Sequence, residues 1–316
     1  MTRRALVLGA GGVLGYTWMV AALHSLQQAF GLDARSTQVC VGTSAGSVAA
    51  ALLGRGVSVE ALLRHQRGEP AADDPRIDWD YDVDSGDALP PRPGFGWGSP
   101  RLTAAALRHP RRLPAPAALS GLLPRGRGTL TPLHRMVSGL SGRGWPDAPR
   151  PWLVALDYDR GRRVPFGRPG SPEVPLADAV IASCAIPGWY APVSIGESRY
   201  VDGGTCSPAS LNLLAGRGFD EVIVLAPMVS FAYDSPRSPI ARAERRWRRG
   251  LTRRLLREAA AVRASGTRVV MFAPGAEDLA ALGANLMDPG RRRTVLETAL
   301  RTTAAAMGAR RTEVTQ

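Results

Sequence analysis

The sequence contains no lysine, so all 40 of its basic residues are arginines. Without a lysine amine there can be no serine–lysine catalytic pair, no phosphate-loop lysine and no Schiff base with pyridoxal phosphate. The formal net charge of +13 suits an anionic partner such as a nucleic acid or a membrane surface. Because no zinc finger, RNA-recognition strand or other nucleic-acid motif is present, we expect no nucleic acid as a partner.

Cysteine and histidine are also scarce. The chain has 3 cysteines and 4 histidines, with no Cys-x-x-Cys pair and no His-Glu-x-x-His motif. An odd and sparse set of cysteines argues against a disulfide framework and fits a reducing compartment. These residues therefore predict neither a disulfide-stapled fold nor a metal site.

Long apolar runs are missing as well. The basic start followed by apolar residues resembles a signal peptide, but four glycines between residues 9 and 15 interrupt it. No segment approaches the ~18 consecutive apolar residues of a membrane span. We therefore expect a cytoplasmic protein, with peripheral contact to the anionic inner face of the membrane as a further expectation from its charge.

What the sequence does contain is a serine flanked by glycines. Residues 39–41 are apolar, as in a buried parallel strand, and residues 47–53 are rich in the helix formers alanine and leucine. Between them Gly42, Ser44 and Gly46 form G-x-S-x-G, the pattern of a nucleophile elbow. In such an elbow the helix dipole favours the negative charge of an attacking alkoxide. The pattern also arises by chance in a glycine-rich chain, so it needs support from elsewhere.

A glycine-rich stretch follows the first expected strand. Residues 4–8 are apolar, residues 9–15 read GAGGVLG, and a helix is expected over residues 16–30. The dinucleotide-binding pattern G-x-G-x-x-G fails, because Leu14 occupies the last glycine position when counting starts at Gly9. The bare N–H groups of small residues favour stabilisation of a tetrahedral oxyanion, and a plain tight turn is the remaining interpretation.

The order of strand, glycine loop, helix, strand, elbow and helix predicts a parallel sheet with right-handed crossovers. We predict an α/β fold with three layers, α/β/α, and a mostly parallel central sheet, forming a single domain over residues 1–316. Further strands are expected at residues 152–157, 162–166, 221–226 and 268–273, and further helices at 176–183, 242–264 and 291–307.

Residues 68–150 interrupt this alternation. Proline and glycine are dense there, acidic residues cluster between 73 and 87, and Trp79, Tyr81, Phe95 and Trp97 are interleaved. The segment is an irregular insert for which two interpretations stand. It is either a lid over the edge of the sheet or a solvated loop with an acidic face.

A nucleophilic serine needs a base, and histidine is poorly placed to serve. In the α/β-hydrolase order a histidine follows the acid, but none lies after His134. His24 falls in the first expected helix, and His109 and His134 fall in the insert. A carboxylate acting directly remains, and Asp202, which ends an apolar stretch and precedes two glycines, is best placed. A tight turn with an Asx bond is the alternative explanation for this Asp-Gly-Gly.

A glycine-rich loop, a G-x-S-x-G elbow and a downstream Asp-Gly-Gly thus occur in order. In this combination the chain resembles the patatin-like phospholipase family of serine acyl hydrolases. Residues 182–188, ASCAIPG, look like the family's segment ahead of the acid, and residues 199–204, RYVDGG, look like the acid turn. The resemblance marks residues 4–215 as the catalytic region, to which residues 216–316 add strands and closing helices of the same globule.

The resemblance implies a role for each matching residue. Ser44 would be the nucleophile and Asp202 its partner in a Ser–Asp dyad. The backbone N–H groups of Gly11, Gly12 and Val13 would form the oxyanion hole. The glycines that shape the elbow and the two loops are Gly15, Gly42, Gly46, Gly203 and Gly204.

The chain departs from the family pattern at Leu14, often a basic residue, and at Ala10, often a glycine, but backbone donors do not depend on these side chains. We therefore expect a serine acyl hydrolase that cleaves carboxylic esters of lipids, with no metal and no cofactor. The alternative is a catalytically idle protein that binds lipid or a membrane surface on the same fold. A dinucleotide-binding enzyme is the third candidate.

Overall fold

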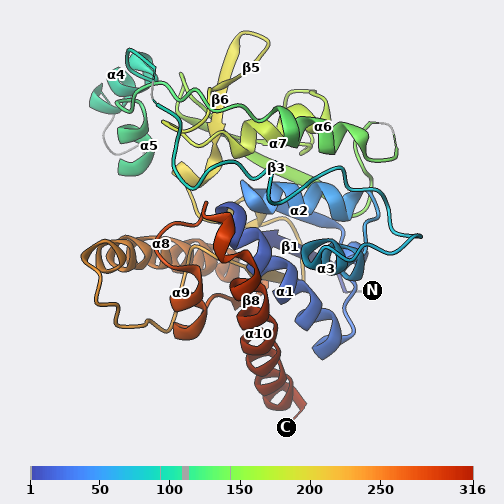
Figure 1. The fold of residues 1–316 in the computed structure, drawn as a ribbon. Coiled ribbons are helices and arrows are strands. Elements are labelled where there is room, and N and C mark those ends of the chain that lie inside the picture. Colours follow the sequence, from blue (N-terminus) through green and yellow to red (C-terminus); the bar gives the residue numbers. More distant parts are fainter. Residues whose placement is uncertain (1, 93, 109–113, 143, 316) are drawn as a thin grey trace.

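An eight-stranded sheet runs through the centre of the protein (Figure 1), in a computed structural model that describes residues 2–92, 94–108, 114–142 and 144–315. Its strand order is β5-β6-β3-β2-β1-β7-β8, and β4 also pairs with β3. The strands are β1 (Arg4–Leu8), β2 (Val39–Thr43), β3 (Arg150–Asp157), β4 (Arg162–Phe166), β5 (Val193–Ile195), β6 (Ser198–Asp202), β7 (Glu221–Leu225) and β8 (Arg268–Phe272).

The sheet is mostly parallel, as expected. The five neighbours β3-β2-β1-β7-β8 all run parallel, whereas β4, β5 and β6 pair antiparallel. Side chains of β1 alternate between two separate cores, Leu6 and Leu8 in one and Ala5 and Val7 in the other. A strand buried on both faces requires a helical layer on each face, which is why its sequence is a continuous apolar run.

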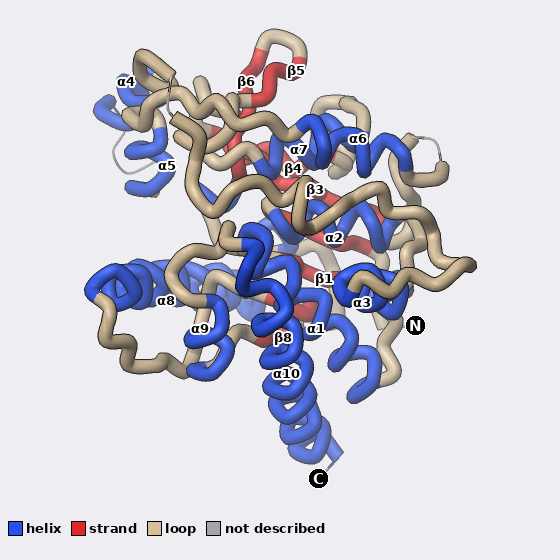
Figure 2. Tube along the Cα trace, in the orientation of Figure 1, coloured by secondary structure: helices blue, strands red, loops and turns tan. Residues whose placement is uncertain are grey.

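Helices cover both faces of the sheet, so the three-layer fold class is confirmed, and Figure 2 shows the strands lying between them. The second core is covered by α8 (Pro239–Ala264). The helices that contribute to the first core are α1 (Gly12–Phe30), α2 (Ala45–Gly54), α3 (Val59–Arg67), α6 (Thr131–Gly139), α7 (Leu176–Cys184), α9 (Ala276–Leu282) and α10 (Arg292–Thr315).

The expected strands lie within two residues of their observed bounds, but helix positions differ in places. The first helix begins at Gly12, four residues before the predicted start, because the N–H of Gly15 donates to the carbonyl of Gly11 and closes a helical turn. The sequence patterns do not predict α3 and α9. Residues 68–150 contain α4 (Pro100–Arg108), α5 (Ala115–Ser120) and α6 between β-strand segments of the central sheet.

Candidate active site

Ser44 lies between the end of β2 and the start of α2, on a turn that only glycine neighbours allow. Its backbone has φ 55° and ψ −122°, a conformation that costs free energy for a residue with a side chain. A Cβ atom added at Gly42 would lie 2.5 Å from the carbonyl oxygen of Gly46, and one added at Gly46 would lie 2.0 Å from that of Leu8. The two glycines therefore let the elbow close against β1.

Asp202 reaches Ser44 because β2 and β6 follow one another along the same edge of β3. Val154 pairs with Thr43 on that edge, and the next residue, Ala155, pairs with Asp202. On the opposite edge of β3, Val154 and Ala155 pair with β4. The residue after Thr43 and the last residue of β6 are thus brought side by side, close enough for the Ser44 hydroxyl to lower the pKa of the Asp202 carboxyl group as a hydrogen-bond donor.

The Asp202 carboxylate is buried, with 5% of the residue exposed. Burial raises its pKa to about 6, while the hydrogen bonds from the Ser44 side chain and from the N–H of Gly204 act in the opposite direction. The Gly204 bond measures 2.7 Å. At neutral pH this group is an ionised carboxylate with a raised proton affinity, which suits it to accept a proton.

Ser183 contributes a contact that sequence reasoning missed. The N–H of Ser44 donates a hydrogen bond of 3.0 Å to Oγ of Ser183, whose hydroxyl donates at 2.7 Å to the carbonyl of Val154. The hydroxyl of Ser47 donates to the carbonyl of Ser44 at 2.6 Å. Both backbone polar groups of Ser44 are therefore held by buried hydroxyls. The only sequence signal was the position of Ser183 within the ASCAIPG segment.

Three successive backbone N–H groups of the glycine loop point to no acceptor within the described residues. The preceding amides of Gly9 and Ala10 donate to the carbonyls of Leu225 and Pro208, and the following amides of Leu14 and Gly15 donate to those of Leu286 and Gly11. The unpaired amides are those of Gly11, Gly12 and Val13. Two of these residues, Gly12 and Val13, line one cavity with Ser44.

Pro227 packs against the glycine loop at Gly11 and so fixes the position of the loop. A Cβ added at Gly11 would lie 2.7 Å from Cγ of Pro227, so only a glycine permits this approach. The carbonyl of Pro227 accepts a 2.5 Å hydrogen bond from the buried guanidinium of Arg248, which also donates to Glu244 at 2.9 Å. Gly203 is equally constrained, because an added Cβ would lie 2.4 Å from the carbonyl oxygen of Val154.

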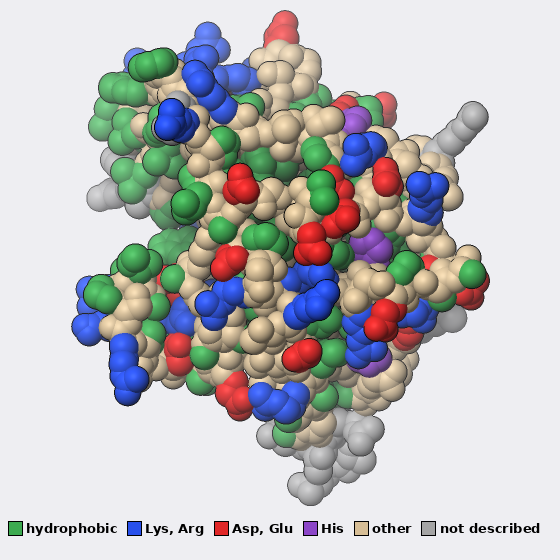
Figure 3. All heavy atoms as spheres, in the orientation of Figure 1, with side chains coloured by type: hydrophobic (Ala, Val, Ile, Leu, Met, Phe, Trp, Pro, Cys, Tyr) green, Lys and Arg blue, Asp and Glu red, His purple; other side chains and the backbone are tan. Residues whose placement is uncertain are grey.

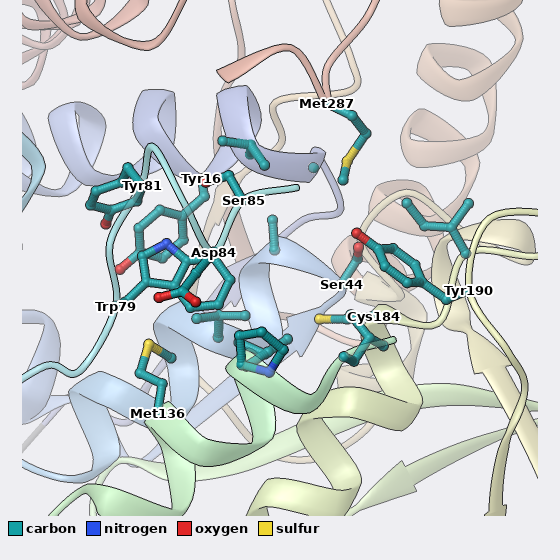
Figure 4. A pocket seen from close by; sticks show the side chains of 18 of the residues that line it. Tyr16, Ser44, Trp79, Tyr81, Asp84, Ser85, Met136, Cys184, Tyr190 and Met287 are labelled. Carbon is teal, nitrogen blue, oxygen red and sulfur yellow. The ribbon is translucent and has the colours of Figure 1, made fainter. Parts of the chain in front are cut away.

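Ser44 opens into a cavity of about 110 Å³ with mainly apolar walls. Figure 4 shows Ser44 at one end of it, beside Cys184, Tyr190 and Met287. The insert builds the opposite end, to which both Trp79 and Tyr81 contribute. The insert residues that line the cavity are Ile77, Trp79, Tyr81, Asp84, Ser85, Thr129, Leu130, Pro132, Leu133 and Met136.

The four aromatic residues singled out in the insert separate into two pairs. Trp79 and Tyr81 line the cavity. Phe95 and Trp97 are 97% and 59% exposed and are not among its lining residues.

Histidine is not part of this site in the portion of the chain that the structure describes. His65 lies near the hydroxyl of Tyr81 at 3.3 Å, and His134 lies 3.0 Å from a carboxylate oxygen of Asp178. His24 is on α1 and does not line the cavity. His109 falls outside the described residues.

Among the described residues, no group of three or more histidine, cysteine, aspartate or glutamate side chains is arranged to hold a metal ion. Within the same residues, every helix is too short or too polar to cross a lipid bilayer.

Comparisons with known proteins show which family model the sequence matches and which solved structures are similar. A family model described as patatin-like phospholipase matches residues 6–215. Among solved structures, VipD from Legionella pneumophila is similar with a TM-score of 0.44 and 12% identity, over 98% of this chain and 67% of that one. The type III effector protein ExoU is similar with a TM-score of 0.41 and 16% identity, over 98% of this chain and 53% of that one. The chain thus spans about half the length of ExoU, and no curated protein matches it.

Proposed function

The chain belongs to the patatin-like phospholipase family, and we propose that it hydrolyses lipid acyl esters through a Ser44–Asp202 dyad. The observation that carries the proposal is the pairing of a buried, hydrogen-bonded carboxylate with a serine held at φ 55° on a strand-to-helix elbow. A serine with an adjacent base at a cavity wall is the arrangement that nucleophilic acyl transfer requires.

In the acylation step, Oγ of Ser44 attacks the ester carbonyl carbon while its proton passes to the carboxylate of Asp202. The carbonyl oxygen becomes an oxyanion, and the unpaired N–H groups of Gly11, Gly12 and Val13 are the donors available to stabilise it. Collapse of this intermediate breaks the bond to the alkoxy oxygen. The leaving alcohol takes the proton back from Asp202, and the acyl group stays on Ser44 as an ester.

Deacylation repeats these steps with water as the nucleophile. Asp202 accepts a proton from the water, the hydroxide attacks the acyl carbon, and the same amides hold the second oxyanion. Release of Ser44 as the leaving group then yields the carboxylic acid and the starting enzyme. A carboxylate with pKa about 6 is basic enough to accept the proton and acidic enough to return it.

The substrate class is inferred from the cavity and the family. The walls of the cavity carry aromatic, leucine and methionine side chains, which suit the hydrocarbon chain of an acyl group. A lipid substrate is presented at a membrane surface, so we also propose peripheral contact with an anionic membrane, to which a chain of net charge +13 is attracted.

The decisive experiment is covalent labelling with a fluorophosphonate probe, which reacts with an activated serine hydroxyl. We expect the wild-type protein to be labelled on Ser44 and to hydrolyse a p-nitrophenyl ester. Ser44→Ala should lose both properties, and Ser210→Ala should keep them. Ser210 is the matched control because it is the other non-glycine residue with positive φ among those described, at 53°. Full labelling of Ser44→Ala would show that another residue is the nucleophile. An unlabelled and inactive wild type would favour the catalytically idle lipid-binding protein.

A further inference from the structure

The insert divides by charge into two parts. Residues 69–87 carry eight acidic residues and one arginine, whereas residues 88–146 carry nine arginines and no acidic residue. The whole chain has 27 acidic residues, so their complete absence from the second part is not a matter of low acid content. The basic part therefore generates a local positive potential of its own.

The basic part also exposes large hydrophobic side chains. Phe95 is 97% exposed and Leu107 is 79% exposed, so most of their apolar surface stays in contact with water. Thirteen large hydrophobic side chains are exposed among the described residues, and six of them fall within residues 95–123. These six are Phe95, Trp97, Leu107, Leu119, Leu122 and Leu123.

Backbone contacts bring these side chains together. The N–H of Gly98 donates to the carbonyl of Leu123 at 2.8 Å, and the N–H of Gly94 donates to that of Arg125 at 2.7 Å. The helices α4 and α5, which carry Leu107 and Leu119, pack against each other. We call residues 94–108 and 114–128 the α4–α5 platform. Figure 3 shows hydrophobic and basic side chains gathered where α4 and α5 lie in Figure 1, at the upper left.

The platform is firmly attached to the sheet. On its inner side Leu102 of α4 and Ala117 of α5 are fully buried in a small core with Leu156 and Tyr158. The hydroxyl of Tyr158 donates a 2.6 Å hydrogen bond to the carbonyl of Ser120. The platform thus has a packed inner face, and among the described residues its outer apolar side chains remain exposed.

Arginines border the exposed apolar surface. Arg108, Arg125 and Arg127 are all exposed, and within the described residues none of them makes an ion pair. Exposed apolar groups beside uncompensated positive charge are the combination that binds the interface of an anionic bilayer. There the apolar groups enter the acyl boundary and the guanidinium groups contact lipid phosphates.

The platform adjoins the cavity that contains Ser44. The N–H of Gly128 donates to the carbonyl of Trp189 at 2.9 Å, and Gly126 packs against Tyr190 so closely that an added Cβ would lie 2.4 Å from the Tyr190 carbonyl oxygen. Tyr190 lines the cavity, as does Thr129, the residue that follows the platform. A surface seated on the platform would therefore lie next to the cavity.

We propose that the α4–α5 platform docks the protein on an anionic membrane surface. The docked membrane would then lie next to the Ser44 cavity, which receives its lipid substrate from it. The choice of a bilayer over an acidic protein rests on the proposed lipid hydrolysis, and the docking itself does not require that Ser44 be active. Phe95, Trp97 and Leu107 enter the membrane interface in this proposal, while Arg108 and Arg125 contact anionic headgroups.

The test is co-sedimentation of the full-length Ser44→Ala protein with vesicles of phosphatidylcholine, with and without phosphatidylglycerol. We expect binding to the anionic vesicles that weakens as salt is added. The double variants Phe95→Ser/Leu107→Ser and Arg108→Gln/Arg125→Gln should each bind at least tenfold more weakly. Two arginines at ~1 kcal/mol each correspond to about a 30-fold loss.

The matched control is Phe30→Ser/Arg217→Gln, made at the opposite end of the sheet, where α1 ends and β7 is about to begin. It should bind like the parent. Unchanged binding of both platform variants would overturn the proposal, as would a parent protein that binds neither vesicle. Retention on polyglutamate without vesicle binding would assign the surface to an acidic protein instead.

The same platform variants with Ser44 intact separate this proposal from the proposed function. Their hydrolysis of a water-soluble short-chain ester should equal that of the wild type, because none of the described platform residues lines the cavity that contains Ser44. Vesicle binding without any ester hydrolysis by the wild type would refute the catalytic proposal and leave the docking surface standing. Hydrolysis without vesicle binding would refute the docking surface alone.

Discussion

The N–H of Ser44 donates a hydrogen bond to the hydroxyl of Ser183, which in turn donates to the carbonyl of Val154. One buried hydroxyl therefore joins the elbow, the helix α7 and the strand β3. Val154 is also the residue whose pairing with Thr43 fixes the end of β2. The strained conformation of Ser44 is thus held by contacts from two elements that are remote from it in sequence, α7 and β3.

Replacing Ser183 should loosen the elbow. Ser183→Ala leaves the N–H of Ser44 and the carbonyl of Val154 without this partner, which typically costs ~1–3 kcal/mol of unfolding free energy. We expect kcat for ester hydrolysis to fall about tenfold or more with KM changed less, since the geometry of the attacking oxygen matters most in the transition state. Steady-state kinetics and thermal unfolding measure the two effects.

The control for that variant is Ser25→Ala. Ser25 is also buried and its hydroxyl pairs with Thr303 at 2.7 Å, between α1 and α10 and away from the cavity. It should lose comparable stability while kcat stays near the wild-type value. An equal fall in kcat in both variants would show that Ser183 acts only through general stability.

Asp202 should control the pH dependence of hydrolysis. Only the ionised carboxylate can accept the Ser44 proton, and its pKa is raised to about 6. We therefore expect kcat/KM to fall as the pH drops through about 6. Asp202→Asn should lower kcat by about 10²–10⁴-fold, the usual contribution of a general base. His134→Ala should retain activity, and a collapse there in a folded protein would contradict the dyad.

The same carboxylate should make the native protein less stable at high pH. The folded pKa of about 6 lies above the ordinary value of 3.8, so the folded state binds more protons than the unfolded state between these values. Stability therefore falls as the pH rises from about 4 to 6, by up to ~3 kcal/mol for a two-unit shift. Asp202→Asn should raise Tm at pH 8, with a smaller difference at pH 4. A variant that is less stable than wild type at pH 8 would show that ionised Asp202 stabilises the fold.

The glycine loop can be tested with a pair of alanine variants. Gly12 and Gly31 have nearly equal φ values of 60° and 62°, so at both positions an alanine would have to adopt the positive φ that favours glycine. A Cβ at Gly12 would lie 2.8 Å from the sulfur of Met287 and 2.9 Å from the carbonyl of Leu286, whereas nothing lies within 4 Å at Gly31. Gly12→Ala should displace the unpaired amides and reduce kcat by about a hundredfold. Gly31→Ala should lose ~1 kcal/mol of stability and keep its kcat.

The two tryptophans of the insert should behave differently. Trp79 lines the cavity, so Trp79→Ala should change kcat/KM for long-chain esters more than for acetyl esters. Trp97 is exposed and does not line the cavity, so Trp97→Ala should leave both unchanged when the ester is monomeric in solution. Measuring a series of p-nitrophenyl esters tests this. If Trp79→Ala changed kcat/KM equally for every chain length, the insert would have no role in recognising the acyl chain.

Local sequence determined much of the fold and the elements that carry the site. The runs over residues 4–8 and 221–226 predict buried strands because a strand covered on both faces has to be apolar throughout. The elbow at Ser44 could be predicted because its requirement is steric and local: residues 42 and 46 must lack side chains for strand and helix to approach. The Asp-Gly-Gly at the end of β6 could be predicted for the same steric reason, because Gly203 lies so close to the carbonyl of Val154 that a side chain would not fit.

Tertiary structure alone decided which remote residues meet. Asp202 lies beside Ser44 because Thr43 and Asp202 pair with consecutive residues of β3, and no local pattern specifies the register between distant strands. Ser183 could not be identified as a partner of Ser44 for the same reason. The path of the insert likewise depends on packing against α1 and the sheet, so composition could not tell that Trp79 would line the cavity while Trp97 faced the solvent.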